Sequence, residues 1–319
     1  MTWPSLVCLG FQKCGTTTLY EILRQHPGVA LCRDVKEPMY LRVLGLTHIG
    51  GGAYYEKRYF GHLADDDPRM PVEVNAGLTF TGCAEKVARY YPADTKLLFM
   101  MRNPVDRSFS AYRYFLARGF LPTSAVELDQ REGHAAGFDA YVHSVLDDDE
   151  LRGDVMRKRL KYLVFSQSRY ATCIREYLRS FPVSQMHFAI FEEFVADQHA
   201  GMRRIYDFCG LDDADGIDYG VRGNCRREAT SSAARSKRMQ FMKGWCYGFH
   251  EFVAMGYWLP SFEHWFQGKY REYRSGTLVA DHDDSKMLPE TRAFLEEHYA
   301  EEVRDLEAIL ARDLSDVWF

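Results

Sequence analysis

Hydrophobic and polar positions divide this chain into short apolar runs and longer stretches with helical spacing. Short continuous apolar runs are typical of strands that are buried on both faces of a parallel sheet. The sequence has such a run at 96–101, and shorter, largely apolar stretches at 6–10, 29–32, 72–74 and 186–190 are further strand candidates. Apolar residues three and four positions apart predict helices over residues 16–25, 83–91, 168–179 and 289–310. Because runs and helices alternate, the pattern predicts an α/β fold, a single domain with a central parallel sheet flanked by helices.

The first apolar run ends in a turn with the composition of an anion-binding loop. Gly10, Lys13 and Gly15 precede three consecutive threonines at 16–18, which begin a predicted helix. The amides of a first helical turn have no partner within the helix, and the helix dipole adds partial positive charge there. A phosphate therefore fits this turn, with Lys13 as an additional cation. An ordinary strand-turn-helix connection is the structural alternative.

The spacing of this loop separates it from the loop that binds ATP or GTP with Mg²⁺. That loop needs its Lys directly before the last Ser or Thr, whereas Lys13 precedes Gly15. The order Gly10-x-x-Lys13-x-Gly15-Thr16-Thr17 instead resembles the 5′-phosphosulfate loop of sulfotransferases that use 3′-phosphoadenosine 5′-phosphosulfate (PAPS). The resemblance implies a donor-binding set made of Lys13, Cys14, Gly15, Thr16, Thr17 and Thr18. It also implies that Lys13 is catalytic, because it would stabilise charge that develops on the leaving phosphate.

A second phosphate-binding signal follows the apolar run 96–101. Asn103 suits the N-cap and Pro104 the first position of a helix, so Arg102 lies where the strand ends. Ligands of open α/β folds bind at the carboxyl edge of the parallel sheet. Ser110 lies six residues further into the helix, about 9 Å along its axis. The cationic fork of Arg102 and the hydroxyl of Ser110 provide the donors that a terminal phosphate requires.

This second segment resembles the 3′-phosphate motif Arg-Asn-Pro-x-x-Arg-x-x-Ser-x-Tyr of PAPS sulfotransferases. Many helices begin with Asn and Pro, so the motif alone is weak evidence. Two motifs in the family's order, each at a strand-to-helix turn, support the resemblance more strongly. Several glycan sulfotransferases have a His four residues after the Ser, where this chain has Tyr114. The resemblance therefore does not extend to a second acid or base at that position.

A charged pair, Lys36 and Glu37, follows the predicted strand 29–32. A solvated loop carboxylate next to Pro38 is the structural interpretation. In glycan sulfotransferases that this chain resembles, the Glu of a Lys-Glu-x-x-aromatic segment is the general base, and Glu37 matches it. Residues 72–77 lack the Lys with which these families contact substrate, and they lack the His that steroid and phenol sulfotransferases use as base. The resemblance thus implies Glu37 as the catalytic base.

Other segments are assigned from composition and from the same resemblance. Residues 45–70 are rich in Gly, Tyr and Asp and predict a mobile loop near the site. Residues 118–165 have little regular spacing, and the resemblance makes them a variable insertion on the acceptor side. Residues 222–238 form a basic loop that closes over the donor or, equally, a solvated linker. The cofactor-binding residues of that loop are Arg235, Lys237 and Arg238. The aromatic residues of 241–273 favour core packing over a sugar-stacking wall.

Composition limits the remaining function classes. The 319 residues carry 40 Lys and Arg against 45 Asp and Glu, a net charge of −5, which argues against non-specific nucleic-acid binding. No apolar stretch approaches the roughly 18 residues of a membrane span. The eight Cys form no C-x-x-C pair, so we expect no metal site and a location in the reducing cytoplasm. The oligomeric state is left open.

The resemblance to PAPS-dependent sulfotransferases covers nearly the whole chain and is strongest for the carbohydrate and heparan-sulfate-type enzymes. It implies a fold related to P-loop nucleotide kinases. It also implies transfer of a sulfuryl group from PAPS to a hydroxyl, less readily an amine, of a saccharide or other small natural product. The nucleotide product is then 3′-phosphoadenosine 5′-phosphate (PAP), and no metal takes part. A P-loop nucleotide kinase and a non-catalytic nucleotide-binding or glycan-binding protein are the alternatives.

Overall fold

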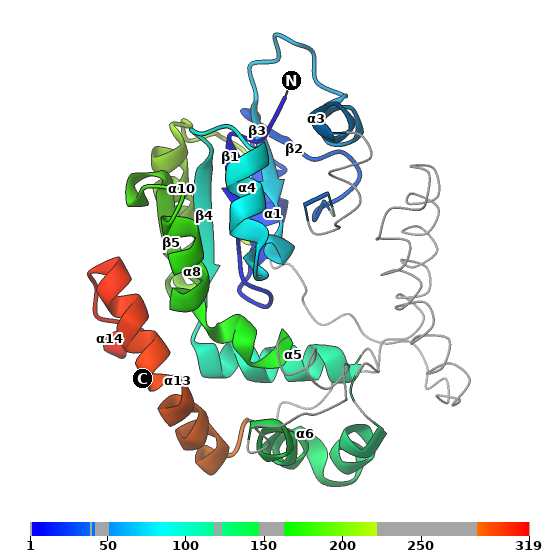
Figure 1. Cartoon of the computed structure of the whole chain (residues 1–319), viewed down its shortest axis with the longest axis vertical. Coiled ribbons are helices and arrows are strands. Elements are labelled where there is room, and N and C mark those ends of the chain that lie inside the picture. Colours follow the sequence, from blue (N-terminus) through cyan, green and yellow to red (C-terminus); the bar gives the residue numbers. More distant parts are fainter. Residues whose placement is uncertain are drawn as a thin grey trace.

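A five-stranded parallel sheet forms the centre of the molecule (Figure 1). The computed structural model describes residues 2–38, 40–41, 51–117, 121, 123–146, 163–221 and 286–318. The strands are β1 (Leu6–Cys8), β2 (Val29–Leu31), β3 (Met70–Val74), β4 (Lys96–Met101) and β5 (Met186–Ile190). Their order is β2-β3-β1-β4-β5, and all neighbours are parallel. The predicted strands and the predicted α/β fold class are confirmed.

Helices on both faces of the sheet explain why its strands are continuous apolar runs. In β4, all residues from 97 to 101 are 0% exposed. β1 is the central strand, and its Val7 lies between Glu73 of β3 and Leu97 of β4. The loop that follows β1 therefore lies next to the ends of β3 and β4.

The helices of the described residues pack on the two faces of the sheet and below the carboxyl ends of its strands. They are α1 (Thr16–Leu23), α3 (Gly51–Tyr55), α4 (Cys83–Tyr90), α5 (Pro104–Ala117), α6 (Thr123–Leu146), α8 (Tyr170–Leu178), α9 (Phe191–Ala196), α10 (Gln198–Cys209), α13 (Pro289–Leu310) and α14 (Ser315–Trp318). α4 and α8 contact each other. The connection through α1 runs along the sheet in the opposite direction to the one through α4, so right-handed crossovers place α1 on the other face. There His26, just after α1, contacts Tyr206 of α10, with 4.7 Å between ring centroids.

Helix α5 crosses below the carboxyl end of β4 and forms a layer of its own with α6 and α13 (Figure 1). The hydroxyl of Ser108 on α5 lies 2.8 Å from that of Tyr299 on α13. On the α6 side, Phe109 and Phe138 have ring centroids 5.0 Å apart. These contacts fix α5 so that its first turn faces the loop after β1.

One segment differs from the prediction. Residues 45–70 were predicted as a mobile loop, but the part from 51 to 60 is helical and its Tyr55 and Tyr59 are 0% exposed. The composition of this segment is typical of a loop, yet its aromatic rings pack into the core. In 118–165, where the sequence has little regular spacing, residues 123–146 form α6. A non-helical residue, Gly133 with φ 85°, interrupts α6, so helical spacing does not continue along it.

Residues 222–238 and 241–273 lie outside the described residues, and the predictions for them stay predictions. The final part of 118–165 is described from residue 163 onward, where it leads into α8. Within the described helices, none has the length and apolar composition needed to cross a bilayer.

Candidate active site

The loop between β1 and α1 has the backbone geometry of an anion cradle. Gly15 is the N-cap of α1 with φ 86°, and no side chain caps the helix. A Cβ at Gly15 would lie 2.7 Å from the ring of Phe191, and one at Gly10 would lie 1.9 Å from Thr16 Cγ2. Glycine is therefore required at both positions. The uncapped helix N-terminus directs the amides of its first turn toward the space beyond β1.

Lys13 has a left-handed backbone, with φ 74°. This conformation costs a non-glycine residue of order 1–2 kcal/mol and tends to occur at functional sites. Two left-handed residues separated by one position form a concave backbone of the kind that holds anions. The Lys13 Nζ lies 4.6 Å from the ring centroid of Tyr114 on α5. The side chain of Lys13 thus extends from the cradle to α5.

Cys14 packs beneath the loop. Its amide donates to the carbonyl of Phe11 at 3.1 Å, and its Sγ lies 3.8 Å from the Tyr170 hydroxyl. The thiol is fully buried, and burial raises its pKa to about 11. The side chain of Cys14 is therefore a neutral packing group that shapes the cradle.

Lys36 joins the cradle to the predicted base. Its Nζ donates to Thr16 Oγ1 at 3.0 Å and to Thr17 Oγ1 at 3.2 Å. The same Nζ lies 3.5 Å from Glu37 Oε1. Burial lowers the pKa of Lys36, and the neighbouring Glu37 opposes this shift. From the sequence, Lys36 was recognised only as one half of a charged pair, although its place directly before Glu37 was the available signal.

Glu37 lies on a turn that is anchored to the end of β3. Its side chain is 38% exposed, so an acceptor can reach the carboxylate. The carbonyl of the following residue, Pro38, accepts a hydrogen bond from Asn75 Nδ2 at 2.7 Å. Asn75 Nδ2 also donates to Glu73 Oε1 at 2.7 Å. A buried side-chain network thus fixes the turn, while the carboxylate of Glu37 faces solvent.

Arg102 lies at the carboxyl end of β4, beside the cradle. Its Nη1 lies 3.5 Å from the carbonyl of Lys13, and its guanidinium lies 4.9 Å from the ring centroid of Phe191. The Tyr170 hydroxyl donates to the Arg102 carbonyl at 2.7 Å. The two predicted phosphate-binding segments therefore meet because β1 and β4 are neighbours in the sheet.

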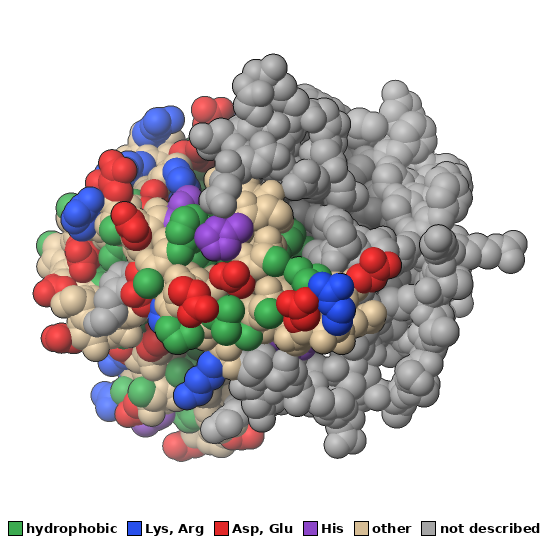
Figure 2. Space-filling view, turned by 90° about the horizontal axis from the view of Figure 1, so that it is seen from below, with side chains coloured by type: hydrophobic (Ala, Val, Ile, Leu, Met, Phe, Trp, Pro, Cys, Tyr) green, Lys and Arg blue, Asp and Glu red, His purple; other side chains and the backbone are tan. Residues whose placement is uncertain are grey.

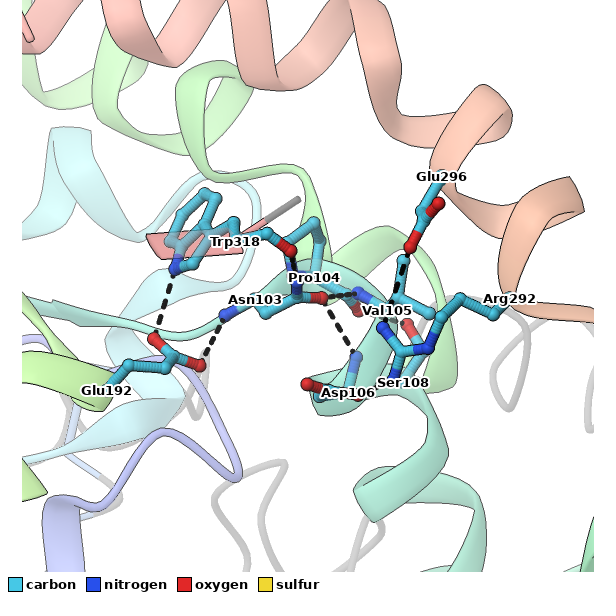
Figure 3. Close-up of polar contacts among 9 residues, drawn as sticks. All are labelled: Asn103, Pro104, Val105, Asp106, Ser108, Glu192, Arg292, Glu296 and Trp318. Carbon is cyan, nitrogen blue, oxygen red and sulfur yellow. Dashed lines mark hydrogen bonds and ion pairs between the residues drawn. The ribbon is translucent and has the colours of Figure 1, made fainter. Parts of the chain in front are cut away.

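Asn103 caps α5 as predicted. Its Oδ1 accepts from the amides of Val105 at 2.9 Å and Asp106 at 3.2 Å (Figure 3). Ser110 and Tyr114 lie one turn apart on the same face of α5. Since Tyr114 contacts Lys13, this face of α5 is turned toward the cradle. Ser110 thus lies on the face of α5 that is turned toward the cradle, where the predicted contact with a phosphate requires it.

The cradle and the Arg102 turn flank a topological switch point. From β1 the chain runs through α1 toward β2, whereas β4 leads to β5 on the other side of the sheet. Open α/β folds bind ligands in the crevice between two such strands. Figure 2 views the molecule from below and shows acidic, basic and hydrophobic side chains intermixed on the described part of this face. Lys13, Lys36 and Arg102 gather at the cradle: Lys13 belongs to it, Lys36 binds its threonines and Arg102 lies beside the Lys13 carbonyl.

Part of the predicted site falls outside the described residues. Arg235, Lys237 and Arg238 lie there, so their contribution stays a prediction. Within the described ranges, His, Cys, Asp and Glu form no group of three or more that could hold a metal ion. Glu73, Glu192 and Trp318 were not identified from the sequence, because their contacts join segments far apart in the chain.

Comparison with known proteins identifies relatives over most of the chain. Residues 4–252 match the model of the sulfotransferase domain. The chain is 27% identical over 220 residues to heparan sulfate glucosamine 3-O-sulfotransferase 3B1 of Mus musculus, covering 65% of this chain and 46% of that protein. For heparan sulfate glucosamine 3-O-sulfotransferase 3A1 of Homo sapiens the identity is 27% over 221 residues, with 65% and 44% covered. The chain thus spans less than half the length of these curated relatives.

A solved structure shares the fold over nearly its whole length. The crystal structure of a sulfotransferase from Alicyclobacillus acidocaldarius aligns with a TM-score of 0.61 and 24% identity, covering 99% of each chain. The likeness in architecture therefore reaches beyond residues 4–252, the part that the family model matches. The family model itself covers well over half of the chain. The chain belongs to the sulfotransferase domain family of enzymes.

Proposed function

We propose that this protein transfers a sulfuryl group from PAPS to a hydroxyl of a saccharide or a similar aliphatic alcohol. The observation that carries the proposal is the meeting of two anion-binding segments at neighbouring strand ends. The Arg102 Nη1 lies 3.5 Å from the carbonyl of Lys13, the central residue of the cradle. A nucleotide with phosphates at both its 5′ and 3′ positions suits this arrangement better than one with a single phosphate chain.

The donor set fits PAPS chemically. The first turn of α1 offers amide donors and Lys13 a cation for a 5′-phosphosulfate. Arg102 and Ser110 offer a forked cation and a hydroxyl for a 3′-phosphate. When bound, PAPS supplies an activated sulfuryl group, and its transfer leaves PAP.

Each residue of the site then has a defined task. Lys13 and the first-turn amides of α1 stabilise negative charge at the 5′-phosphate end of the site. Lys36 fixes the hydroxyls of Thr16 and Thr17 and pairs with Glu37. Glu37 takes the proton of the acceptor hydroxyl, a role that its exposed carboxylate permits. These tasks need positioning and fixed charge, as in phosphoryl transfer.

Two observations support a saccharide-type acceptor. The relatives reported above are named as heparan sulfate glucosamine 3-O-sulfotransferases. In addition, the candidate base is a carboxylate on a solvent-facing turn. An aliphatic hydroxyl needs such a base because its proton is weakly acidic.

We also propose a reducing location such as the cytoplasm. The support is that Cys8, Cys14, Cys32, Cys83, Cys173 and Cys209 are all buried free thiols. Reducing compartments keep thiols in this form. Localisation of a tagged full chain tests the proposal, and an oxidising compartment would contradict it.

Calorimetry separates the proposed function from its alternatives. We expect PAP to bind without Mg²⁺ and more tightly than ATP, whereas a nucleotide kinase would prefer ATP with Mg²⁺. A panel of saccharide acceptors with labelled PAPS then distinguishes an enzyme from a non-catalytic binding protein, which would show no transfer.

Substitution of the base tests the mechanism. Glu37→Gln keeps the shape of the side chain and removes its basicity, so the transfer rate should fall by about 10²–10⁴-fold. PAP affinity and the melting temperature should remain close to those of the wild type. Wild-type turnover in Glu37→Gln would assign the base to another residue.

A further inference from the structure

The turn that carries Arg102 is held by two segments far away in the sequence (Figure 3). The amide of Asn103 donates to Glu192 Oε1 at 3.0 Å. The other carboxylate oxygen, Oε2, accepts from Trp318 Nε1 at 3.0 Å. The backbone carbonyl of Trp318 in turn accepts from Asn103 Nδ2. Asn103, Glu192 and Trp318 thus form a closed ring of hydrogen bonds, and Asn103 directly follows Arg102 in the chain.

Asn103 and Trp318 of the ring are buried, Glu192 is partly buried, and every polar atom of Asn103 has a hydrogen-bond partner. Asn103 is 3% exposed and Trp318 is 4% exposed. The Oδ1 of Asn103 caps α5, and its amide and Nδ2 belong to the ring. Because unpaired polar groups are costly at such sites, the three residues have little freedom to move separately.

The same turn of α9 also contacts the side chain of Arg102. Phe191 precedes Glu192 and lies under the guanidinium of Arg102, 4.9 Å from ring centroid to Cζ. Glu192 therefore fixes the backbone that follows Arg102, and Phe191 supports the side chain of Arg102.

The ring also determines which groups donate hydrogen bonds to the Glu192 carboxylate. Both oxygens of Glu192 are occupied by neutral N–H donors. The described residues contain no ion pair of Arg102, although Glu192 lies close to it in the fold. A carboxylate held in this way does not compete with a bound anion for the guanidinium.

We propose that Glu192, held by Trp318, is a positioning residue that keeps the guanidinium of Arg102 oriented and available for the 3′-phosphate of the donor. The inference rests on the proposed function, since it concerns the same nucleotide. Loss of the ring should weaken recognition of the 3′-phosphate specifically, because the proposed function assigns that group to Arg102.

The test measures affinity for two ligands in the same set of variants. PAP carries the 3′-phosphate, and adenosine 5′-phosphosulfate lacks it. In Glu192→Gln an amide NH₂ faces the N–H of Trp318 or of Asn103, so one hydrogen bond of the ring is lost. Trp318→Phe is a milder variant that removes only the indole N–H and keeps an aromatic ring. We expect PAP to bind at least tenfold more weakly in Glu192→Gln and several-fold more weakly in Trp318→Phe, with adenosine 5′-phosphosulfate changed less than twofold.

The adjacent carboxylate provides a matched control. Glu193 pairs with Arg312, whose Nη1 lies 3.1 Å from Glu193 Oε2, and makes no contact with Asn103. Glu193→Gln should leave the affinities for both ligands unchanged. Melting temperatures of all variants separate a loss of stability from a loss of recognition.

The possible outcomes distinguish this inference from the proposed function. Equal losses for both ligands in Glu192→Gln and Trp318→Phe would overturn the positioning role in favour of a general structural one. Unchanged PAP affinity in both variants would overturn it as well. If the wild-type protein itself bound both ligands equally, the proposed function and this inference would fall together.

Discussion

At the scale of single residues, Lys36 contacts both the cradle and the candidate base. Its ammonium group can only donate hydrogen bonds, so the hydroxyls of Thr16 and Thr17 must act as acceptors toward it. Each hydroxyl then directs its own proton elsewhere, and that proton is polarised by the neighbouring cation. Lys36 also pairs with Glu37. One cation thus prepares the cradle for an anion and holds the candidate base.

Replacing this cation should reduce the rate of transfer. Lys36→Met keeps most of the length of the side chain and removes its charge and its three donors. Because preorganised electrostatic contacts of this kind contribute about 10²–10³-fold, we expect a loss of about 10²-fold in kcat. Turnover with labelled PAPS and an identified acceptor measures the effect.

A second partly buried lysine serves as the control for Lys36→Met. Lys96 donates to the carbonyls of Phe208 at 2.7 Å and Cys209 at 3.0 Å, at the amino end of β4 and away from the site. Lys96→Met should lower stability and leave kcat unchanged. A wild-type kcat in Lys36→Met would remove Lys36 from the mechanism.

At the scale of secondary-structure elements, β3 supports the turn of Glu37 through a buried carboxylate. Glu73 is 1% exposed and accepts hydrogen bonds from Asn75, Tyr55 and Tyr91, the last at 2.6 Å. Burial raises the pKa of Glu73, although these hydrogen bonds oppose the shift. The folded protein therefore holds the Glu73 proton more tightly than the unfolded chain does.

This shift gives a pH dependence with a definite sign. A raised carboxyl pKa contributes stability below the pKa of the unfolded chain, and the contribution is lost as the pH rises through the folded pKa. Glu73→Gln cannot ionise. The free energy of unfolding of the wild type, minus that of Glu73→Gln, should therefore fall as the pH rises from about 4.5 toward neutrality.

Urea denaturation at several pH values measures this difference. Glu85→Gln, at an exposed position of α4, controls for the loss of a surface carboxylate. A difference that grows with pH would show that the hydrogen bonds to Glu73 outweigh its burial.

The elements themselves were largely predictable, because local patterns determine them. The apolar runs of β1 and β4, and the turns that follow them, located Lys13 and Arg102 from adjacent residues alone. Contacts between distant segments leave no such local signal. Asn103 and Trp318 are 215 positions apart, and Glu73 meets its tyrosines from 18 positions away on either side. Nor could composition distinguish a loop from the buried aromatic segment that contains Tyr55.

At the scale of the whole molecule, the proposed nucleotide site is assembled from separate parts of the chain. The cradle follows β1, the Arg102 turn follows β4, and the ring around Asn103 adds α9 and α14. A ligand that contacts both the cradle and the Arg102 turn therefore stabilises the packing of the whole sheet. Such a ligand binds the folded state alone, because the unfolded chain does not bring these segments together.

Thermal unfolding should report this coupling directly. At a PAP concentration of 100 times its Kd, linkage predicts about 2.7 kcal/mol of added stability, which raises Tm by several degrees for a chain of this size. Adenosine 5′-phosphosulfate at the same concentration should give a smaller rise, because it makes no contact with Arg102. In Arg102→Ala the difference between the two ligands should shrink, since the cation assigned to the 3′-phosphate is removed and the hydroxyl of Ser110 remains. Differential scanning calorimetry measures both shifts, and an equal rise with the two ligands in the wild type would contradict a site that spans the cradle and the Arg102 turn.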